Sequence, residues 1–447
     1  MKRIGKEMSV FLPANILLPT EKNLEKWSVI ACDQFTSQPE YWKLVREYVG
    51  SVPSTLHLIL PEAELNQNDL QDSVKLQENS NTELEGSKDK GELKNRIKTI
   101  NSYMEEYIEN DIFDVYKNCY IYVERTLQNG TIRKGVVGMV DLEQYDYERD
   151  TSSYIRPTEQ TVIERIPPRV LVRQNAKLEL SHILLFCNDK EQTLLEFLEQ
   201  NKNHLQKAYD LELMMDGGSL KGWLVQGEIA TIFNEKIQQY EQKIKEEYNN
   251  QEPMLYAVGD GNHSLATAKA CYEQLKKQYP QKDFSNHPAR YAMVELENIC
   301  DKVQQFEPIH RVITNVDVLH LLQEMKQKIG ICEESKNVKA VPITYYCGEE
   351  EGVFYLKENN SEILLETIQN FLDNYLKENQ GEIDYIHGKD ILKQLSKQEN
   401  TIGFVLSTID KTQLFSEIIK KGVLPRKTFS MGHAKEKRYY METRQIQ

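Results

Sequence analysis

The sequence predicts a mixed α/β protein (α+β mixed) of two to three packed units with mixed sheets. Its 447 residues are about three times the commonest domain length. Apolar residues make up 40% of the chain, which is enough to build buried cores. Strand-like and helix-like patterns alternate along the chain, and a strand, a glycine turn and a helix follow one another near its centre.

The first unit is expected over residues 1–150. Residues 66–95 are polar and lack aromatic side chains, which is typical of a solvated insertion. A hairpin is predicted after it because Asn129 and Gly130 form a strong two-residue turn signal between apolar segments. The predicted elements are a helix over 94–107 and hairpin strands over 119–127 and 132–142.

The central unit is expected over residues 151–315. Apolar residues recur at helical spacing through its longest segment, which indicates an amphipathic helix. The other segments are short apolar runs bounded by turn residues. The predicted elements are strands over 178–187, 254–258 and 289–296 and helices over 228–248 and 264–279.

The third unit is expected over residues 316–447 and carries a basic tail. Gly422 followed by Pro425 marks the end of its last helix, as expected for a C-terminal glycine with a proline beyond it. The predicted elements are helices over 318–329, 363–376 and 411–421, a hairpin over 341–347 and 352–356, and a strand over 401–407.

Charge and composition exclude several classes of protein. Lysine and arginine total 55 against 69 acidic residues, so the net charge of −14 argues against nucleic-acid binding. No apolar run approaches the roughly 20 residues that span a membrane, and no signal-peptide pattern is present, so a cytoplasmic protein is expected. Its seven scattered cysteines are expected to be reduced, and no spacing suggests a zinc, haem or iron–sulfur site.

The most informative segment is the predicted turn between the strand over 254–258 and the following helix. Two glycines let the backbone approach a ligand closely, and the N-terminus of a helix attracts an anion. A carboxylate beside an anion suits a bridging divalent metal, and a histidine titrates near neutral pH. The candidate residues are Gly259, Asp260 (also the candidate metal ligand), Gly261, Asn262, His263 and Ser264. In this interpretation Asn262 or Ser264 caps the helix. The alternative is an ordinary turn in which Asp260 and Asn262 act as caps and His263 has its hydrogen bonds satisfied.

A second candidate segment is rich in arginine. Four of the 15 arginines fall within residues 156–173, although lysine dominates elsewhere. The planar guanidinium group suits bidentate recognition of phosphate or carboxylate, so an anion clamp is predicted. The candidate ligand-binding residues are Arg156, Thr158, Thr161, Arg165 and Arg169, with Glu159 beside them. The alternative is a salt-bridged loop in which Glu159 and Glu164 pair with these arginines.

Two further segments carry weaker signals. His310 and Arg311 interrupt an apolar run, which fits either a ligand contact or a buried histidine bonded to backbone. Residues 420–444 contain eight lysines or arginines, and among them Arg426 and Lys427 are candidate phosphate ligands. The alternative for this basic stretch is a solvated face.

Together these segments resemble the DUF1015 family, bacterial and archaeal proteins of unassigned function. The resemblance rests on residues 31–35, 156–161, 165–169, 258–264, 308–311 and 424–428. The turn is also similar to one in the ParB and sulfiredoxin superfamily, which includes free serine kinases and nucleotide-binding partition proteins. That likeness implies nucleotide contacts by Asp260, Gly261, Asn262 and His263. Those relatives usually carry arginine where this chain has Ser264, so phosphate neutralisation would come from Arg156, Arg169, Arg311 or Lys427.

The leading functional hypothesis is a phosphoryl-transfer enzyme, a kinase that uses a nucleotide (ATP or ADP) and Mg²⁺ to act on a small metabolite such as an amino acid, for example serine. Asp260 would position the metal, an arginine would neutralise charge, and Glu159 or His263 would accept the substrate proton. The alternatives are a nucleotide- or metabolite-binding regulator without turnover, and a metal-dependent hydrolase using Asp260, His263 and His310. A small anionic ligand is the expected partner. The oligomeric state stays open, a homodimer included.

Overall fold

The computed structural model describes most of the chain. The described residues are 9–20, 24–36, 38–65, 69, 73, 88–149, 151–161, 166–248, 252–332, 342–356, 361–425 and 427–447. They form two compact units, Met1–Gln304 with His433–Gln447, and Gln305–Gly432. The boundaries expected near residues 150 and 315 stay a prediction. Most of the polar insertion expected over 66–95 lies outside the described residues.

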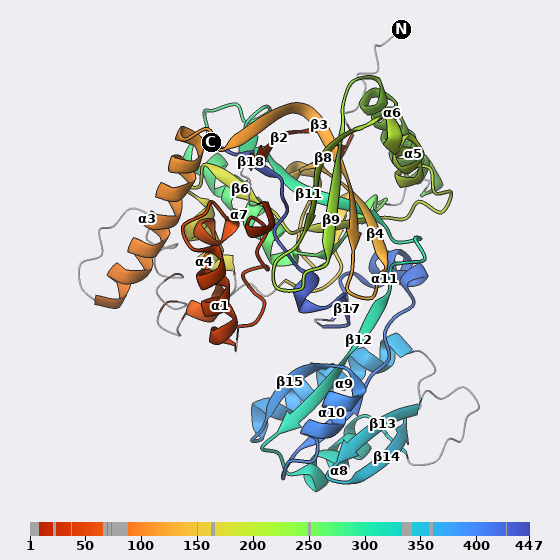
Figure 1. The fold of residues 1–447 in the computed structure, drawn as a ribbon. Coiled ribbons are helices and arrows are strands. Elements are labelled where there is room, and N and C mark those ends of the chain that lie inside the picture. The colour runs from red at the N-terminus through yellow and green to blue at the C-terminus, as the bar shows by residue number, and fades with distance from the viewer. Residues whose placement is uncertain are drawn as a thin grey trace. The chain divides into compact units, whose positions relative to one another are not determined.

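The first unit is a mixed α/β structure built on one curled sheet (Figure 1). Its strands are β1 (Phe11–Leu12), β2 (Ala14–Pro19), β3 (Phe113–Thr126), β4 (Ile132–Asp141), β5 (Ile155–Pro157), β6 (Leu178–Leu180), β7 (Leu184–Cys187), β8 (Gln206–Glu212), β9 (Ser219–Val225), β10 (Tyr256–Asp260), β11 (Tyr291–Asn298) and β18 (Thr443–Gln445). Its helices are α1 (Pro39–Val49), α3 (Lys88–Glu109), α4 (Ile166–Arg173), α5 (Leu195–Asn201), α6 (Gly227–Glu247) and α7 (Asn262–Gln278).

The order of strands in this sheet positions the central turn. The main path runs β5-β10-β7-β11-β4-β3-β2-β18-β6, and β9 joins β8 to β3. β10 pairs in parallel with β5 and antiparallel with β7. The end of β10 therefore lies beside the residues that follow β5 and those that precede β7. Both flanking segments supply side chains to the site described below.

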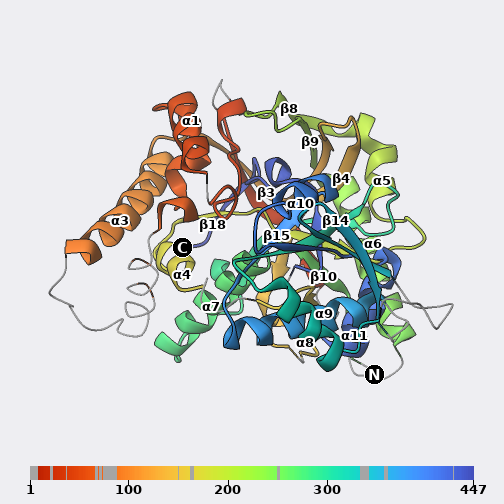
Figure 2. The same cartoon turned by 90° about the horizontal axis from the view of Figure 1, so that it is seen from below.

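Two helices lie next to this end of the sheet. α4 packs against α7, and Figure 2 shows the two side by side. Pro167 and Pro168 stand in the first turn of α4, where a missing backbone N–H costs no intrahelical hydrogen bond. The arginine-rich segment is therefore partly helical, and α4 carries Arg169 toward α7.

The C-terminal segment returns to the first unit and is built into its core. β18 pairs with β2 and β6, so the chain end is tied into the sheet. Before β18, the Arg438 guanidinium donates to the carbonyls of Ser28, at 3.1 Å, and Met214, at 2.6 Å. The Ser28 hydroxyl in turn donates to the Tyr439 carbonyl at 2.5 Å. These contacts hold Lys437 at a fixed place in the unit.

The second unit packs helices against an antiparallel sheet. The strand path is β14-β13-β16-β12-β15, with β17 paired to β12. Its elements are β12 (Phe306–Thr314), α8 (Val318–Lys328), β13 (Pro342–Cys347), β14 (Glu350–Tyr355), α9 (Ser361–Glu378), β15 (Glu382–His387), α10 (Lys389–Leu395), β16 (Ile402–Val405), α11 (Leu414–Lys421) and β17 (Phe429–Met431). Leu321, Ile368, Leu372 and Phe404 belong to its main buried core.

The mixed α/β fold class is confirmed, together with the central strand, glycine turn and helix. The strand expected over 178–187 is wrong in one respect, because it is two strands, β6 and β7, separated by 181–183. At the break, the Ser181 hydroxyl donates to the Met293 carbonyl and accepts from the Ile183 amide. Among the described residues, no helix combines the length and apolar character needed to cross a membrane.

Candidate functional site

The turn after β10 is the centre of the candidate site. β10 ends at Asp260, Gly261 adopts a left-handed conformation with φ +77°, and α7 begins at Asn262. The amides of Ser264 and Leu265 donate to the Gly261 carbonyl at 2.9 and 3.0 Å. Gly261 is the N-cap residue, and no side chain caps α7. The expectation that Asn262 or Ser264 caps this helix is therefore wrong.

Close packing under the turn requires both glycines. A Cβ on Gly259 would lie 2.2 Å from the Phe186 ring, and one on Gly261 would lie 2.9 Å from the Ile183 Cα. The second position also needs a positive φ, which glycine adopts without strain. The turn therefore rests directly on β7 and the residue before it, and this fixes where its amides point.

Asp260 forms an ion pair with Lys437. The Lys437 Nζ lies 3.1 Å from Asp260 Oδ2, while Asp260 Oδ1 accepts the Gly261 amide at 2.9 Å. Burial lowers the pKa of Lys437, but Asp260, with smaller effects from Asp33 and Glu159, leaves this pKa above its ordinary value. Lys437 is therefore a charged ammonium group beside the uncapped N-terminus of α7.

Arg169 forms a second ion-pair group on the other side of Ser264. Its guanidinium lies 3.1 Å from Asp33 Oδ2 and 2.6 Å from Glu62 Oε1, and donates to Ser264 Oγ at 3.2 Å. Burial raises the pKa of Asp33, but the Arg169 charge, with smaller contributions from His182, Gln34 and Lys437, outweighs burial and holds this pKa far below its ordinary value. Only 12% of the Arg169 side chain is exposed, so solvent screens these charges weakly.

His182 links the two ion-pair groups. Its Nε2 lies 3.0 Å from Ser264 Oγ, and its ring packs edge-on against Tyr439. Burial lowers the pKa of His182, although Asp33 and Asp260 oppose this shift. A neutral imidazole is therefore expected at pH 7. We call Asp33, Glu62, Arg169, His182, Asp260 and Lys437 the charge cluster.

Three polar side-chain atoms around this cluster or the turn have no hydrogen-bond partner among the described residues: Thr161 Oγ1, His182 Nδ1 and Asn262 Oδ1. His182 and Thr161 are only 5% and 7% exposed. A buried polar group left unpaired costs about 1–3 kcal/mol unless water or a ligand satisfies it. The turn therefore has hydrogen-bonding capacity that the described chain does not use.

The structure brings several of the sequence-predicted residues together. Asp260, Gly261, Ser264 and Arg169 share direct contacts within the cluster, and Glu159 acts electrostatically on Lys437. His263 stands on the first turn of α7, where its carbonyl accepts the Thr267 hydroxyl at 2.7 Å. The roles predicted for these side chains stay predictions.

Other predicted residues have contacts of their own. Thr158 Oγ1 donates to the Val258 carbonyl at 2.7 Å and so joins the end of β5 to β10. The Arg156 guanidinium donates to the carbonyls of Ser153, at 2.9 Å, and Glu252, at 3.0 Å. These hydrogen bonds to the backbone give Arg156 a structural role. Arg165 and Arg426 lie outside the described residues.

The remaining candidates belong to the second unit. His310 Nδ1 accepts the Leu406 amide at 3.2 Å, and burial lowers the pKa of His310 to about 4. Arg311 donates to Gln369 Oε1 at 2.9 Å and to the Ile309 carbonyl at 2.5 Å. Lys427 is exposed. His310 and Arg311 therefore make hydrogen bonds within the second unit, which gives both side chains a structural role.

Four members of the charge cluster were not predicted as site residues. Asp33 lies in a segment that contributed only to the family resemblance. Lys437 lies in the basic C-terminal stretch, in which only Arg426 and Lys427 were named as candidate ligands. His182 interrupts an apolar run, which is the same signal that drew attention to His310. Glu62 carries no signal in the sequence, because its partner Arg169 is 107 residues away.

The described residues contain no group of three or more His, Cys, Asp or Glu side chains arranged to hold a metal ion. Mg²⁺ in phosphoryl-transfer sites commonly takes one or two carboxylates, with phosphate oxygens and waters completing its shell. Asp260 fits that limited role, because each of its oxygens can accept a further contact beyond the one it makes. The site thus suits a metal that arrives with phosphates.

Comparison with known proteins gives a family and distant structural likenesses. A family model described as "Protein of unknown function (DUF1015)" matches residues 12–375. A free serine kinase in complex with AMP is 11% identical, with a TM-score of 0.38 over 67% of this chain and 88% of that chain. A conserved hypothetical protein from Pyrococcus furiosus is 12% identical, with a TM-score of 0.35 over 66% and 90%. No curated protein matches the chain. TM-scores this low carry no argument about function.

Proposed function

Because the chain belongs to the DUF1015 family of proteins of unknown function, we propose its activity from the site itself, as phosphoryl transfer from a nucleotide to a small metabolite. One observation carries the proposal: the partly buried Lys437–Asp260 ion pair lies at the uncapped N-terminus of α7. An ammonium group, the positive end of a helix and a carboxylate are the three elements that a Mg²⁺-bound phosphate chain requires.

The charges of the cluster support binding of a metal complex rather than a bare polyanion. Two cations, Arg169 and Lys437, face the three carboxylates of the cluster, so 2 − 3 gives a formal charge of −1 when His182 is neutral. A free nucleotide polyphosphate would meet this negative charge in a partly buried site. A bound Mg²⁺ changes the formal charge of the site from −1 to +1. Nucleotide binding is therefore expected to need Mg²⁺.

Each group then has a distinct task in the proposed reaction. The N-terminus of α7 at Asn262 holds a phosphate, Lys437 neutralises its oxygens, and Asp260 supplies a metal ligand. The acceptor hydroxyl forms the new P–O bond, the bond to the nucleotide breaks, and the nucleotide keeps that electron pair. Glu159 or His263, the bases proposed from the sequence, takes the hydroxyl proton.

Phosphorus NMR of ATP or ADP mixed with a panel of small hydroxyl-bearing metabolites tests this proposal. With Mg²⁺, the wild-type protein is expected to convert the nucleotide to a lower phosphate and a new phosphoester. Asp260→Asn keeps the size of the side chain and removes its charge, so the rate is expected to fall at least about 100-fold. Tight nucleotide binding without a new phosphoester for any acceptor would support the regulator instead and contradict the proposal.

A further inference from the structure

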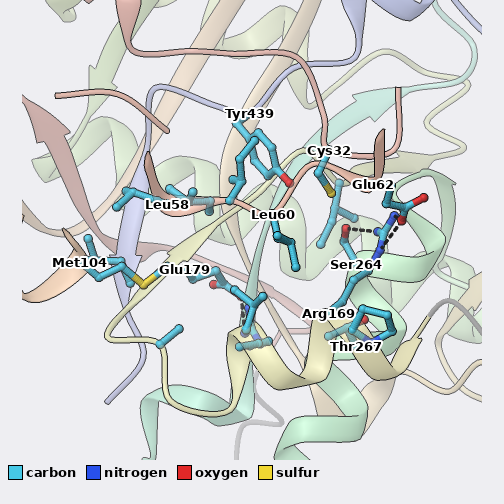
Figure 3. A pocket seen from close by; sticks show the side chains of 18 of the residues that line it. Cys32, Leu58, Leu60, Glu62, Met104, Arg169, Glu179, Ser264, Thr267 and Tyr439 are labelled. Carbon is cyan, nitrogen blue, oxygen red and sulfur yellow. Dashed lines mark hydrogen bonds and ion pairs between the residues drawn. The ribbon is translucent and has the colours of Figure 1, made fainter. Parts of the chain in front are cut away.

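A cavity of about 120 Å³ lies next to the charge cluster in the first unit. Figure 3 shows Cys32, Glu62, Arg169 and Ser264 gathered at one end of it. Ser264 thus belongs both to this cavity and to the first turn of α7. A molecule in the cavity would therefore reach toward the turn where the proposed phosphoryl donor binds.

Most of the cavity wall is apolar. Leu58, Leu60 and Met104 line it in Figure 3, and Val172 and Ala176 complete this part of the wall. A cavity of about 150 Å³ lined by aliphatic and aromatic side chains stays dry and takes a molecule the size of benzene. This cavity is slightly smaller, so an apolar body of about four to six carbon atoms fits it.

The polar end of the cavity favours a hydroxyl group over a carboxylate. Both Arg169 N–H groups that reach Glu62 end on its Oε1, at 3.2 and 2.6 Å, which leaves Oε2 available for a further donor. Asp33 and Glu62 together already exceed the single charge of Arg169. A ligand carboxylate would add a third negative charge here, whereas a hydroxyl can donate to Glu62 and accept from Ser264.

We infer that this cavity binds the acceptor, and that the acceptor is a small alcohol with an apolar body of about four to six carbons. That the bound alcohol is the phosphoryl acceptor rests on the proposed function. That an alcohol binds in this cavity depends only on the shape and lining of the cavity. Glu62 and Ser264 act as positioning residues that direct the hydroxyl toward the turn. Polyhydroxylated molecules of the same size are expected to bind more weakly, because most of the wall is apolar and its other polar side chains already interact. Arg173 pairs with Glu179 at 2.5 Å, and the Thr267 hydroxyl donates to the His263 carbonyl at 2.7 Å.

NMR titration with 3-methyl-1-butanol, and with xylitol as the polar control of equal carbon number, tests the inference in the absence of nucleotide. The wild-type protein is expected to bind the alcohol and not the polyol. Ala176→Leu fills the cavity and is expected to weaken alcohol binding at least 10-fold, while thermal unfolding shows that the variant is folded. Leu60→Ala enlarges the cavity and is expected to shift the preference toward longer alcohols.

The outcomes separate the inference from the proposed function. If xylitol binds as well as 3-methyl-1-butanol, or if Ala176→Leu leaves alcohol binding unchanged, the cavity is not the site and the inference is wrong. Failure of the wild-type protein to bind any of these alcohols contradicts it as well. Nucleotide binding is measured separately. Its absence would contradict the proposed function but would not affect the conclusion that the cavity binds a small alcohol.

Discussion

Arg169→Gln is expected to lower the free energy of unfolding by about 2–4 kcal/mol at pH 7, because the cost of breaking a partly buried ion pair lies between that of an exposed pair and that of a fully buried one. The substitution leaves Asp33 and Glu62 without their shared counter-charge, and it removes the hydrogen bond to Ser264. Urea denaturation followed by circular dichroism measures the change. A loss below about 1 kcal/mol would show that the cluster is as well solvated as an ordinary surface pair.

Arg46→Gln provides the matched control. Arg46 also pairs with a glutamate, Glu64, but 45% of its side chain is exposed. Exposed ion pairs typically contribute no more than about 1 kcal/mol, so this variant is expected to unfold at nearly the wild-type urea concentration. The difference between the two variants isolates the effect of burial.

The effect of Arg169→Gln should also depend on pH in a definite direction. Arg169 holds the pKa of Asp33 below its unfolded value of about 3.9, so Asp33 stabilises the wild-type fold above that pH and this contribution is lost as pH falls. In the variant, the largest contribution that lowers the pKa of Asp33 is gone, and only His182, Gln34 and Lys437 oppose burial, so this pKa lies higher than in the wild type. The difference in unfolding free energy between the two proteins is therefore expected to narrow as pH falls below about 4, and an unchanged difference would contradict the assignment.

Gly261→Ala is expected to cost about 3 kcal/mol or more and to abolish nucleotide binding. The left-handed backbone alone costs a non-glycine residue about 1–2 kcal/mol, and the new Cβ would lie 2.9 Å from the Ile183 Cα, which is backbone and cannot rotate away. Relief of this contact must move the turn off β7. The amides that face the proposed phosphate would move with it.

Gly227→Ala is the control that separates the cost of a left-handed backbone from the cost of a clash by the new Cβ. Gly227 also has a positive φ, +60°, but a Cβ there meets nothing within 4 Å. Only the conformational cost of about 1–2 kcal/mol is expected, with normal nucleotide binding. Equal destabilisation by the two substitutions in urea denaturation would show that the contact under Gly261 relaxes freely and that the turn is not rigid.

Much of the local structure could be predicted from the sequence because it depends on local signals. Gly130 confirms the hairpin turn with φ +80°, and α6 covers nearly the residues whose apolar spacing predicted it. The turn at Gly261 was identified because glycines and polar residues concentrate between a strand pattern and a helix pattern. These features need only neighbours along the chain.

The charge cluster could not be predicted in the same way because its contacts are long-range. Asp33 and Arg169 are 136 residues apart, and Lys437 reaches the turn only because the C-terminal segment returns to the first unit. His182 stands where the expected strand breaks, and only the packing of Ser181 onto β11 reveals that break. Tertiary packing determines which of the many charged residues come together at the turn.

Calorimetric titration of ATP and ADP, each with Mg²⁺ and with a chelator, tests most directly whether the turn is a nucleotide phosphate site. The wild-type protein is expected to bind at least one Mg²⁺–nucleotide complex and to bind neither nucleotide with the chelator present. Lys437→Met is expected to weaken binding at least 10-fold, about 1.4 kcal/mol, whereas Lys243→Met, at a lysine of the first unit whose side chain is 48% exposed and pairs with Glu191, leaves it unchanged. Wild-type affinity in Lys437→Met, or no nucleotide binding by the wild-type protein, would contradict the account.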